Sequence, residues 1–105
     1  MRVTDQSLTA QLAERVMGWT VGPDRFVLPN RGWMPRWRFQ PTQNLEDAFR
    51  LLDAAKPETY TMSATRGREF SVKVRTKGRV GRAQDRSRPL AITLAIARAL
   101  GLDGG

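Results

Sequence analysis

The most constraining feature of the sequence is a nearly uncharged stretch close to its C-terminus, from Ser87 to Gly101. Ser87 or Arg88 can cap a helix, Pro89 falls at a first-turn position, where its missing N–H costs nothing, and Gly101 supplies a left-handed stop. A helix is therefore predicted between these signals. Arg98 is the one charge within that helix, and isoleucines and leucines cover about half of its circumference. Alanines fill most of the rest and allow close packing, so we expect a sheet as the partner. The stretch is far too short to span a bilayer.

Two more helices are predicted from apolar residues that recur with the helical period. The first runs from about Asp5 to Met17, and a glycine follows it directly. The second is capped by Thr42 or Asn44 and is ended by Pro57. Both have one apolar and one polar side, which is typical of helices that cover a core.

Between these two helices the sequence is rich in proline and glycine and predicts mostly loop. Residues 26–28 are expected to form a short edge strand. Trp33 and Met34 are expected to fold inward, and the alternative is an exposed aromatic contact site. Residues 36–39 alternate strictly between arginine and aromatic side chains. This alternation predicts a strand that buries Trp37 and Phe39 on one face.

From Thr59 onward the pattern changes to a period of two. Strands are predicted over 59–64, 70–75 and 79–84, and Gly81 and Ala83 place small side chains where a helix can lie close. The order of elements predicts an α+β domain, an antiparallel sheet of about four strands flanked by three helices as an alpha-beta-alpha sandwich. Its length suits one domain over residues 1–105, with 1–4 and 101–105 frayed.

Three segments carry a family resemblance. They are LAERVMGW from Leu12, W-x-F-x-P-T-x-N-L-E-D-A-F-x-L-L from Trp37, and RPLAITLAIARALGL from Arg88. Together they resemble the phage alpha-beta-alpha (ABA) sandwich domain family of small phage and prophage proteins, over most of the chain from Leu12 to Leu102. The resemblance implies an antiparallel sheet flanked by helices. It implies no established activity and no catalytic residues.

The residue types that are missing restrict the chemistry. The chain has no histidine and no cysteine, which removes the commonest general base, the thiolate nucleophile and the usual transition-metal ligands. Glu46, Asp47 and Asp53 share a predicted helix and are interpreted as its solvated face rather than as a metal site. We therefore predict a protein that is not an enzyme and that binds no cofactor.

Positive charge is the one functional signal in the sequence. The formal net charge is +8, and residues 58–105 hold ten basic and four acidic side chains. Arginine dominates, which suits phosphate or carboxylate recognition, although GC-rich codon usage explains the same bias. The candidate polyanion-binding residues between positions 66 and 88 are Arg66, Arg68, Lys73, Arg75, Lys77, Arg79, Arg82, Arg86 and Arg88.

Arg36 and Arg38 extend this set if their predicted strand neighbours the later ones. Such a strip has the spacing to meet several phosphates, which would position the protein without reading a base sequence. The alternative is that these charges protect a strand edge and keep the protein soluble.

The sequence therefore favours a small phage or prophage accessory protein that binds nucleic acid or a nucleoprotein through the basic strip. The alternative is an anti-defence inhibitor of the anti-CRISPR type that occupies the surface of a host protein, and a structural or assembly role in the virion is a third. No signal peptide is recognisable, so we expect a protein of the bacterial host cytoplasm without membrane association. The oligomeric state is left open.

Overall fold

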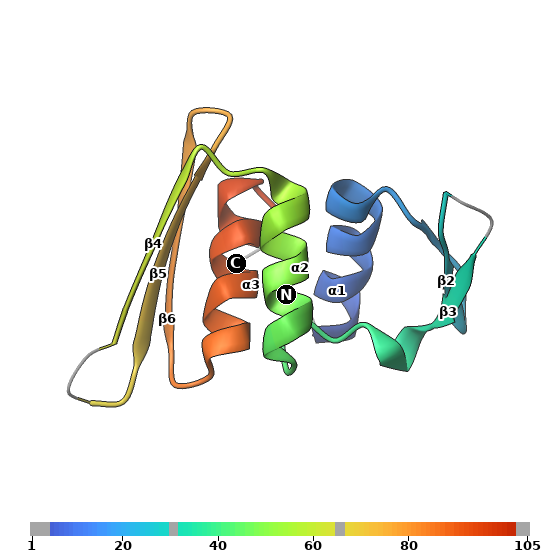
Figure 1. Ribbon diagram of the computed structural model, residues 1–105, viewed down its shortest axis with the longest axis horizontal. Helices are drawn as coiled ribbons and strands as arrows, with labels where there is room; N and C mark the ends of the chain where they lie inside the picture. Colours follow the sequence, from blue (N-terminus) through green and yellow to red (C-terminus); the bar gives the residue numbers. More distant parts are fainter. Residues whose placement is uncertain (1–4, 30–31, 65–66, 103–105) are drawn as a thin grey trace.

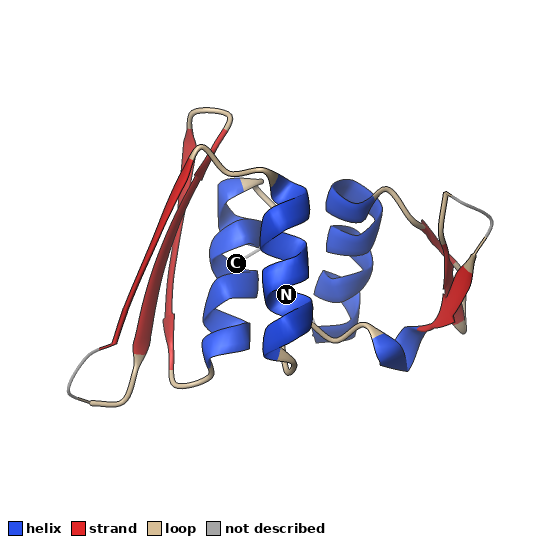
Figure 2. Ribbon diagram, in the orientation of Figure 1, coloured by secondary structure: helices blue, strands red, loops and turns tan. Residues whose placement is uncertain are grey.

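The computed structural model describes residues 5–29, 32–64 and 67–102. Within these ranges the chain forms three α-helices and two three-stranded antiparallel sheets (Figures 1 and 2). In chain order the elements are α1 (Asp5–Leu12), a π-helical turn η1 (Ala13–Met17), β1 (Thr20–Val21), β2 (Arg25–Val27), β3 (Trp33–Pro35), a 3-10 turn η2 (Arg36–Arg38), α2 (Leu45–Ala55), β4 (Thr59–Ala64), β5 (Phe70–Thr76), β6 (Arg79–Asp85) and α3 (Arg88–Ala99).

The elements are stacked in layers along the longest axis of the molecule, which measures 43 Å (Figure 1). The β4–β5–β6 sheet forms one end, α3, α2 and α1 follow, and the β1–β2–β3 sheet forms the other end. α3 packs on β5 and β6 on one side and on α2 on the other. The α+β class with three helices is confirmed, whereas the prediction of one sheet of about four strands is wrong.

The sheet prediction fails at residues 36–39, which form the turn η2 instead of a strand. In a 3-10 turn, residues three apart lie on the same side. Phe39 is therefore fully buried beside Phe26 while Trp37 is 69% exposed, contrary to the prediction that both are buried. Trp19, Phe26 and Phe39 form a cluster of three rings whose centroids lie 5.0–6.0 Å apart. Of the two aromatic residues of the segment 36–39, only Phe39 belongs to this cluster.

The small sheet differs from the prediction in two further ways. β2 lies between β1 and β3, so the strand expected at an edge is the central one. Met34 pairs with Phe26 on the buried face, and Trp33 pairs with Val27 on the opposite face. Since successive strand residues face opposite ways, Trp33 and Met34 cannot both point inward. Trp33 is 58% exposed, and its predicted burial is wrong.

The second half of the chain follows its sequence pattern closely. The three predicted strands are present to within one residue at each end, and β5 pairs with both β4 and β6. Lys77 and Gly78 form the two-residue turn between β5 and β6, and both have positive φ angles, 51° and 77°. This conformation is the usual one in tight hairpins, because its twist matches that of the strands.

The helix ends also lie where capping residues predict them. The side chain of Asn44 accepts a hydrogen bond from the N–H of Asp47 at 3.1 Å, and the side chain of Ser87 accepts one from the N–H of Leu90 at 3.4 Å. Gly18 ends the first helix in the left-handed conformation at φ 73°. Each cap satisfies backbone groups that the helix leaves unpaired.

α3 ends in a glycine cap. Gly101 adopts φ 73°, and the N–H of Leu102 donates to the carbonyl of Ala97 at 2.8 Å. Residues 1–4 and 103–105, for which fraying was predicted, lie outside the described ranges.

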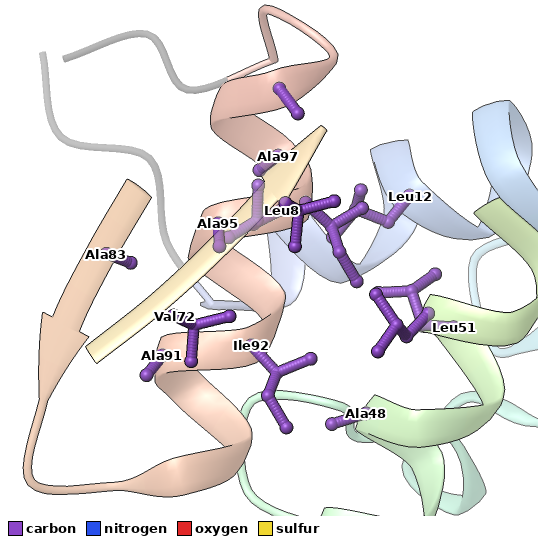
Figure 3. Close-up of a cluster of buried hydrophobic side chains, with 14 of the residues drawn as sticks. Leu8, Leu12, Ala48, Leu51, Val72, Ala83, Ala91, Ile92, Ala95 and Ala97 are labelled. Carbon is purple, nitrogen blue, oxygen red and sulfur yellow. The ribbon is translucent and has the colours of Figure 1, made fainter. Parts of the chain in front are cut away.

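The buried side chains form one core cluster, and Figure 3 shows its part between the helices and the larger sheet. Leu8 and Leu12 of α1, Leu51 of α2 and Ile92 of α3 meet in it, and Val72 of β5 contributes from the sheet side. All five side chains are 5% exposed or less. α3 is thus covered on two sides, as its nearly continuous apolar surface requires.

The closest approach between helix and sheet is at Gly81. A Cβ atom added there would collide with the carbonyl oxygen of Ala95 and the backbone nitrogen of Ala99. Both are backbone atoms of α3, so they cannot move aside as a flexible side chain would. The predicted role of Gly81 is confirmed: it lets the backbone of α3 lie directly on β6.

We predict that Gly81→Ala lowers the free energy of unfolding by about 1–3 kcal/mol or more, because α3 must lift from the sheet to accommodate the methyl group. Gly67→Ala is the matched control, since a Cβ at Gly67 meets nothing within 4 Å. The control should change stability by no more than about 0.5 kcal/mol. Urea denaturation of both variants measures the difference, and equal stabilities would contradict this packing.

Candidate nucleic-acid interface

The outer face of the β4–β5–β6 sheet is its side away from α3. Alternation along the strands places Val72, Val74 and Gly81 beneath the helix and their neighbours on the other side. Within the described residues no helix covers this outer face, as Figure 1 shows. The outer face consists of Thr59, Thr61, Ser63, Ser71, Lys73, Arg75, Val80, Arg82 and Gln84. All are exposed except the half-buried Ser71.

The strand register brings three predicted cations together on this face. Lys73 of β5 pairs directly with Arg82 of β6, and Arg75 lies two residues along β5. Directly paired like charges repel across a ladder. Neither Lys73 nor Arg82 has an ion-pair partner among the described residues, and the nine outer-face residues include no carboxylate.

Two described acidic side chains border the outer face, Glu58 and Glu69, and Oε2 of Glu69 accepts a hydrogen bond from Nε2 of Gln84 at 2.6 Å. Glu58 precedes β4, and its Oε2 lies 3.7 Å from Nε of Arg75 with both side chains about half exposed. Its Oε1 also accepts the N–H of Gly78 at 2.9 Å, which holds Glu58 against the turn. An exposed pair of this length has little effect on stability or charge. Lys73 and Arg82 themselves form no ion pair with a described residue.

Two other predicted cations lie at the C-terminal ends of the helices. A cavity of about 670 Å³ opens where η1, α2 and α3 end, and its basic lining residues are Arg15, Lys56, Lys77 and Arg79. The carbonyl groups at helix C-termini carry partial negative charge, so cations there are stabilising. Lys77 and Arg79 thus have a structural reason for their charge, which Lys73 and Arg82 lack.

The remaining cations of the predicted strip are dispersed. Arg68 lies in the turn before β5 with φ 64°, and Arg86 is exposed in the loop after β6. Arg88 opens α3 and stacks over the ring of Phe70, with 4.6 Å from Cζ to the ring centroid. Arg66 lies outside the described residues. The structure therefore groups Lys73, Arg75 and Arg82, and it does not make one continuous strip.

Arg36 and Arg38 do not join this group. They lie in η2, beside the small sheet in the other half of the molecule (Figure 1). They were predicted to extend the basic strip only if residues 36–39 formed a strand beside β5 and β6. Residues 36–38 form the turn η2 instead. Cζ of Arg38 lies 5.9 Å from the ring centroid of Trp37, and Cζ of Arg36 lies 5.7 Å from that of Phe26.

The exposed Trp33 on the small sheet matches the alternative to its predicted burial, an exposed aromatic contact site. Val27 and Trp33 form an exposed cross-strand pair, and the guanidinium of Arg25 stacks 4.7 Å from the centroid of the Trp33 ring. Arg25 also bonds Asp24, which lowers the pKa of that carboxyl below its ordinary value. Strict alternation of Trp33 with Met34 is the signal that could have placed Trp33 outside.

Asp47, interpreted from the sequence as part of a solvated face, is instead buried, and its Oδ2 accepts the N–H of Gln40 at 3.0 Å. The described residues contain no group of three or more acidic side chains that could hold a metal ion. None of their helices combines the length and the apolar character needed to cross a bilayer.

Comparisons with known proteins identify a family and a fold. Residues 10–96 match the family model described as the phage ABA sandwich domain. The chain is also similar to a phage protein from Bacillus cereus ATCC 14579, known from a 2.0 Å crystal structure, with a TM-score of 0.78 and 16% sequence identity. That match covers 100% of this chain and 94% of the other, and at this identity it shows the fold alone. No curated protein matches the sequence.

We predict that the three tryptophans divide into one buried and two exposed fluorophores. Trp19 is 7% exposed, in contrast to Trp33 and Trp37. Replacing both exposed tryptophans with phenylalanine should leave an emission that is shifted to shorter wavelength and only weakly quenched by acrylamide. Trp19→Phe, the matched control, should retain strongly quenched emission. Equal quenching in the two variants would contradict the outward orientation of Trp33 and Trp37.

Proposed function

The chain belongs to the phage ABA sandwich domain family, as its three segments predicted, and we propose that it is a non-enzymatic phage accessory protein that binds nucleic acid through the outer face of the β4–β5–β6 sheet. It would act in the cytoplasm of the bacterial host. The ligand on this face is the phosphate backbone, and a nucleoprotein that exposes such a backbone is included.

The observation that carries the proposal is the direct pairing of Lys73 with Arg82 on an uncovered sheet face. Two like charges directly opposite each other destabilise a sheet, by roughly the 0.2–1 kcal/mol that favourable cross-strand pairs contribute. Neither side chain forms an ion pair with a described residue, and neither lines the cavity at the helix ends. A bound phosphate backbone would remove the repulsion.

The chemistry of the rest of the outer face supports contact with backbone phosphates rather than with bases. Four of its residues, Thr59, Thr61, Ser63 and Ser71, carry hydroxyl groups that can donate to phosphate oxygens. The outer face holds no aromatic side chain, so it offers no platform on which unpaired bases could stack. A duplex read through its backbone fits this surface better than a single strand does.

We predict that binding to mixed-sequence duplex DNA weakens with salt at a log–log slope of about −2.7, as expected for three phosphates engaged by Lys73, Arg75 and Arg82. Arg82→Gln should reduce the magnitude of the slope by about 0.9 and weaken binding at every salt concentration. Fluorescence anisotropy over a salt series measures both quantities.

Arg79→Gln is the matched control for Arg82→Gln. The two arginines lie on the same strand and each change removes one positive charge, but Arg79 lies on the α3 side next to Gly101. The control should retain the slope and affinity of the unchanged protein. Equal losses in the two variants would show that net charge, and not the outer face, governs binding.

We further predict that Lys73→Glu stabilises the fold while it weakens binding. The change replaces a repulsive pair with Arg82 by an attractive one, and favourable cross-strand charge pairs contribute roughly 0.2–1 kcal/mol. Thermal unfolding and duplex binding of the same sample measure the two effects. Reduced stability together with unchanged binding would contradict the proposed role of Lys73.

A second candidate function is that of an anti-defence inhibitor that binds a host protein. The exposed pair of Val27 and Trp33, with Arg25 stacked on the Trp33 ring, favours this function. Tryptophan and arginine are the residue types that dominate protein interfaces energetically. Negligible binding of duplex DNA at physiological salt would overturn the first proposal and leave this surface as the candidate site.

A further inference from the structure

We propose that the free edge of β4 pairs in antiparallel fashion with β4 of a second copy of this chain, so that the two β4–β5–β6 sheets become one continuous sheet. The inference is independent of nucleic-acid binding. It rests on the direction of backbone groups along β4, on the difference between the two edges of the sheet, and on the residues of β4 itself.

The turn between β5 and β6 determines which backbone groups are free. In a two-residue hairpin the residues that flank the turn, Thr76 and Arg79, form a hydrogen-bonded pair. Hydrogen-bonding direction alternates along a strand, so Arg75 and Lys73 direct their N–H and C=O groups toward β4. The carbonyl of Arg75 accordingly accepts the N–H of Glu58 at 2.8 Å.

The same alternation assigns the groups of β4. Thr59 and Thr61 are the partners of Arg75 and Lys73 and bond to β5. Tyr60, Met62 and Ala64 therefore direct their N–H and C=O groups away from the sheet. No described strand pairs with this edge, and every residue of β4 except the half-buried Met62 is exposed.

The opposite edge of the sheet, formed by β6, is protected against pairing with another strand, whereas the β4 edge is not. Alternation turns the backbone of Arg82 toward the free edge of β6, and its carbonyl accepts a hydrogen bond from Nη1 of Arg98 on α3 at 2.7 Å. Charges and covering elements are common defences of strand edges against pairing. β4 reads TYTMSA and contains no charge, proline or glycine. An undefended strand of this kind is suited to a strand partner.

A second copy fits this edge because β4 is complementary to itself. With the two-fold axis at Met62, that residue faces its own copy, and Tyr60 faces Ala64 of the second copy. A large side chain then lies opposite a small one, twice. The chain has a net charge of +8, but β4 itself contains no charged residue, so pairing two copies of β4 places no like charges opposite each other. A basic strand such as β5 or β6 would repel its copy.

Pairing would also cover apolar surface that α3 does not reach. Tyr60 pairs with Val74 and Met62 with Val72, so both lie on the side of the sheet that faces α3. Tyr60 is nevertheless 51% exposed, because α3 packs mainly on β5 and β6. In the paired form these side chains would meet those of the second copy. The outer faces of the two sheets would also become continuous. Whether a ligand uses this larger surface depends on the proposed nucleic-acid binding.

The first test is the mass of the full chain in solution, without nucleic acid, by light scattering coupled to size exclusion. We expect a species of twice the chain mass of 11.8 kDa as the protein concentration rises. A monomer up to millimolar concentration would overturn the proposal. Because no ligand is present, the result does not depend on whether the outer face binds nucleic acid.

The second test places the interface at β4. The chain has no cysteine, so Met62→Cys introduces a single thiol that would face its own copy across the axis. Paired strands bring opposite Cα atoms to about 5.5 Å, which is within disulfide range. Mild oxidation should give a covalent dimer faster than it does for the control Val80→Cys, which is exposed on β6. If the Val80→Cys variant forms the covalent dimer as fast as the Met62→Cys variant, or faster, the assignment of the interface to β4 is overturned.

Discussion

The packing of α3 on β6 is the contact on which the rest of the molecule depends. Gly81 leaves no side chain between the strand and the helix, and the backbone of α3 at Ala95 and Ala99 occupies the space that a Cβ would fill. Ala83 and Ala91 continue this run of small residues (Figure 3). Because the sheet and the helix approach so closely, one helix is enough to cover β5 and β6.

That contact also explains the layered shape. α3 presents apolar side chains on nearly all sides, so it needs a second partner on the side away from the sheet, and α2 supplies it. The ends of η1, α2 and α3 then gather at one cavity, where the partial charges of three helix C-termini add. Lys56, Lys77 and Arg79 line that cavity and balance this charge. These three of the eighteen lysines and arginines therefore lie where helix ends favour positive charge.

The charge that folding does not explain lies on the outer face of the sheet. Lys73 and Arg82 oppose each other without a described acidic partner, and hydroxyl-bearing residues surround them. The structure thus separates one run of basic residues in the sequence into cations near helix ends, cations on the outer face and dispersed cations. The exposed aromatic pair at the other end of the molecule is a separate surface, since the stacked layers place it far from the basic face (Figure 1).

The sequence by itself determined the elements that depend on neighbouring residues. The caps at Asn44 and Ser87, the turn at Gly78 and the small residue at Gly81 could all be predicted, because each acts on its own backbone or on the period of its own segment. The family could be predicted for the same reason, since three local segments carry it. These features account for three helices and for the β4–β5–β6 sheet.

Only the tertiary structure decided which strands share a sheet and which side chains share a face. Residues 36–39 have the alternation of a strand, but the ring cluster of Trp19 and Phe26 accepts Phe39 and leaves Trp37 in solvent. Strand alternation puts Arg79 and Arg82 on opposite faces, but only the packing of α3 shows that Arg79 lies at a helix end and Arg82 on the open side of the sheet. Local periodicity determines on which face of its own element a side chain lies. It does not determine what packs against that face, because the packing partner comes from a distant part of the chain.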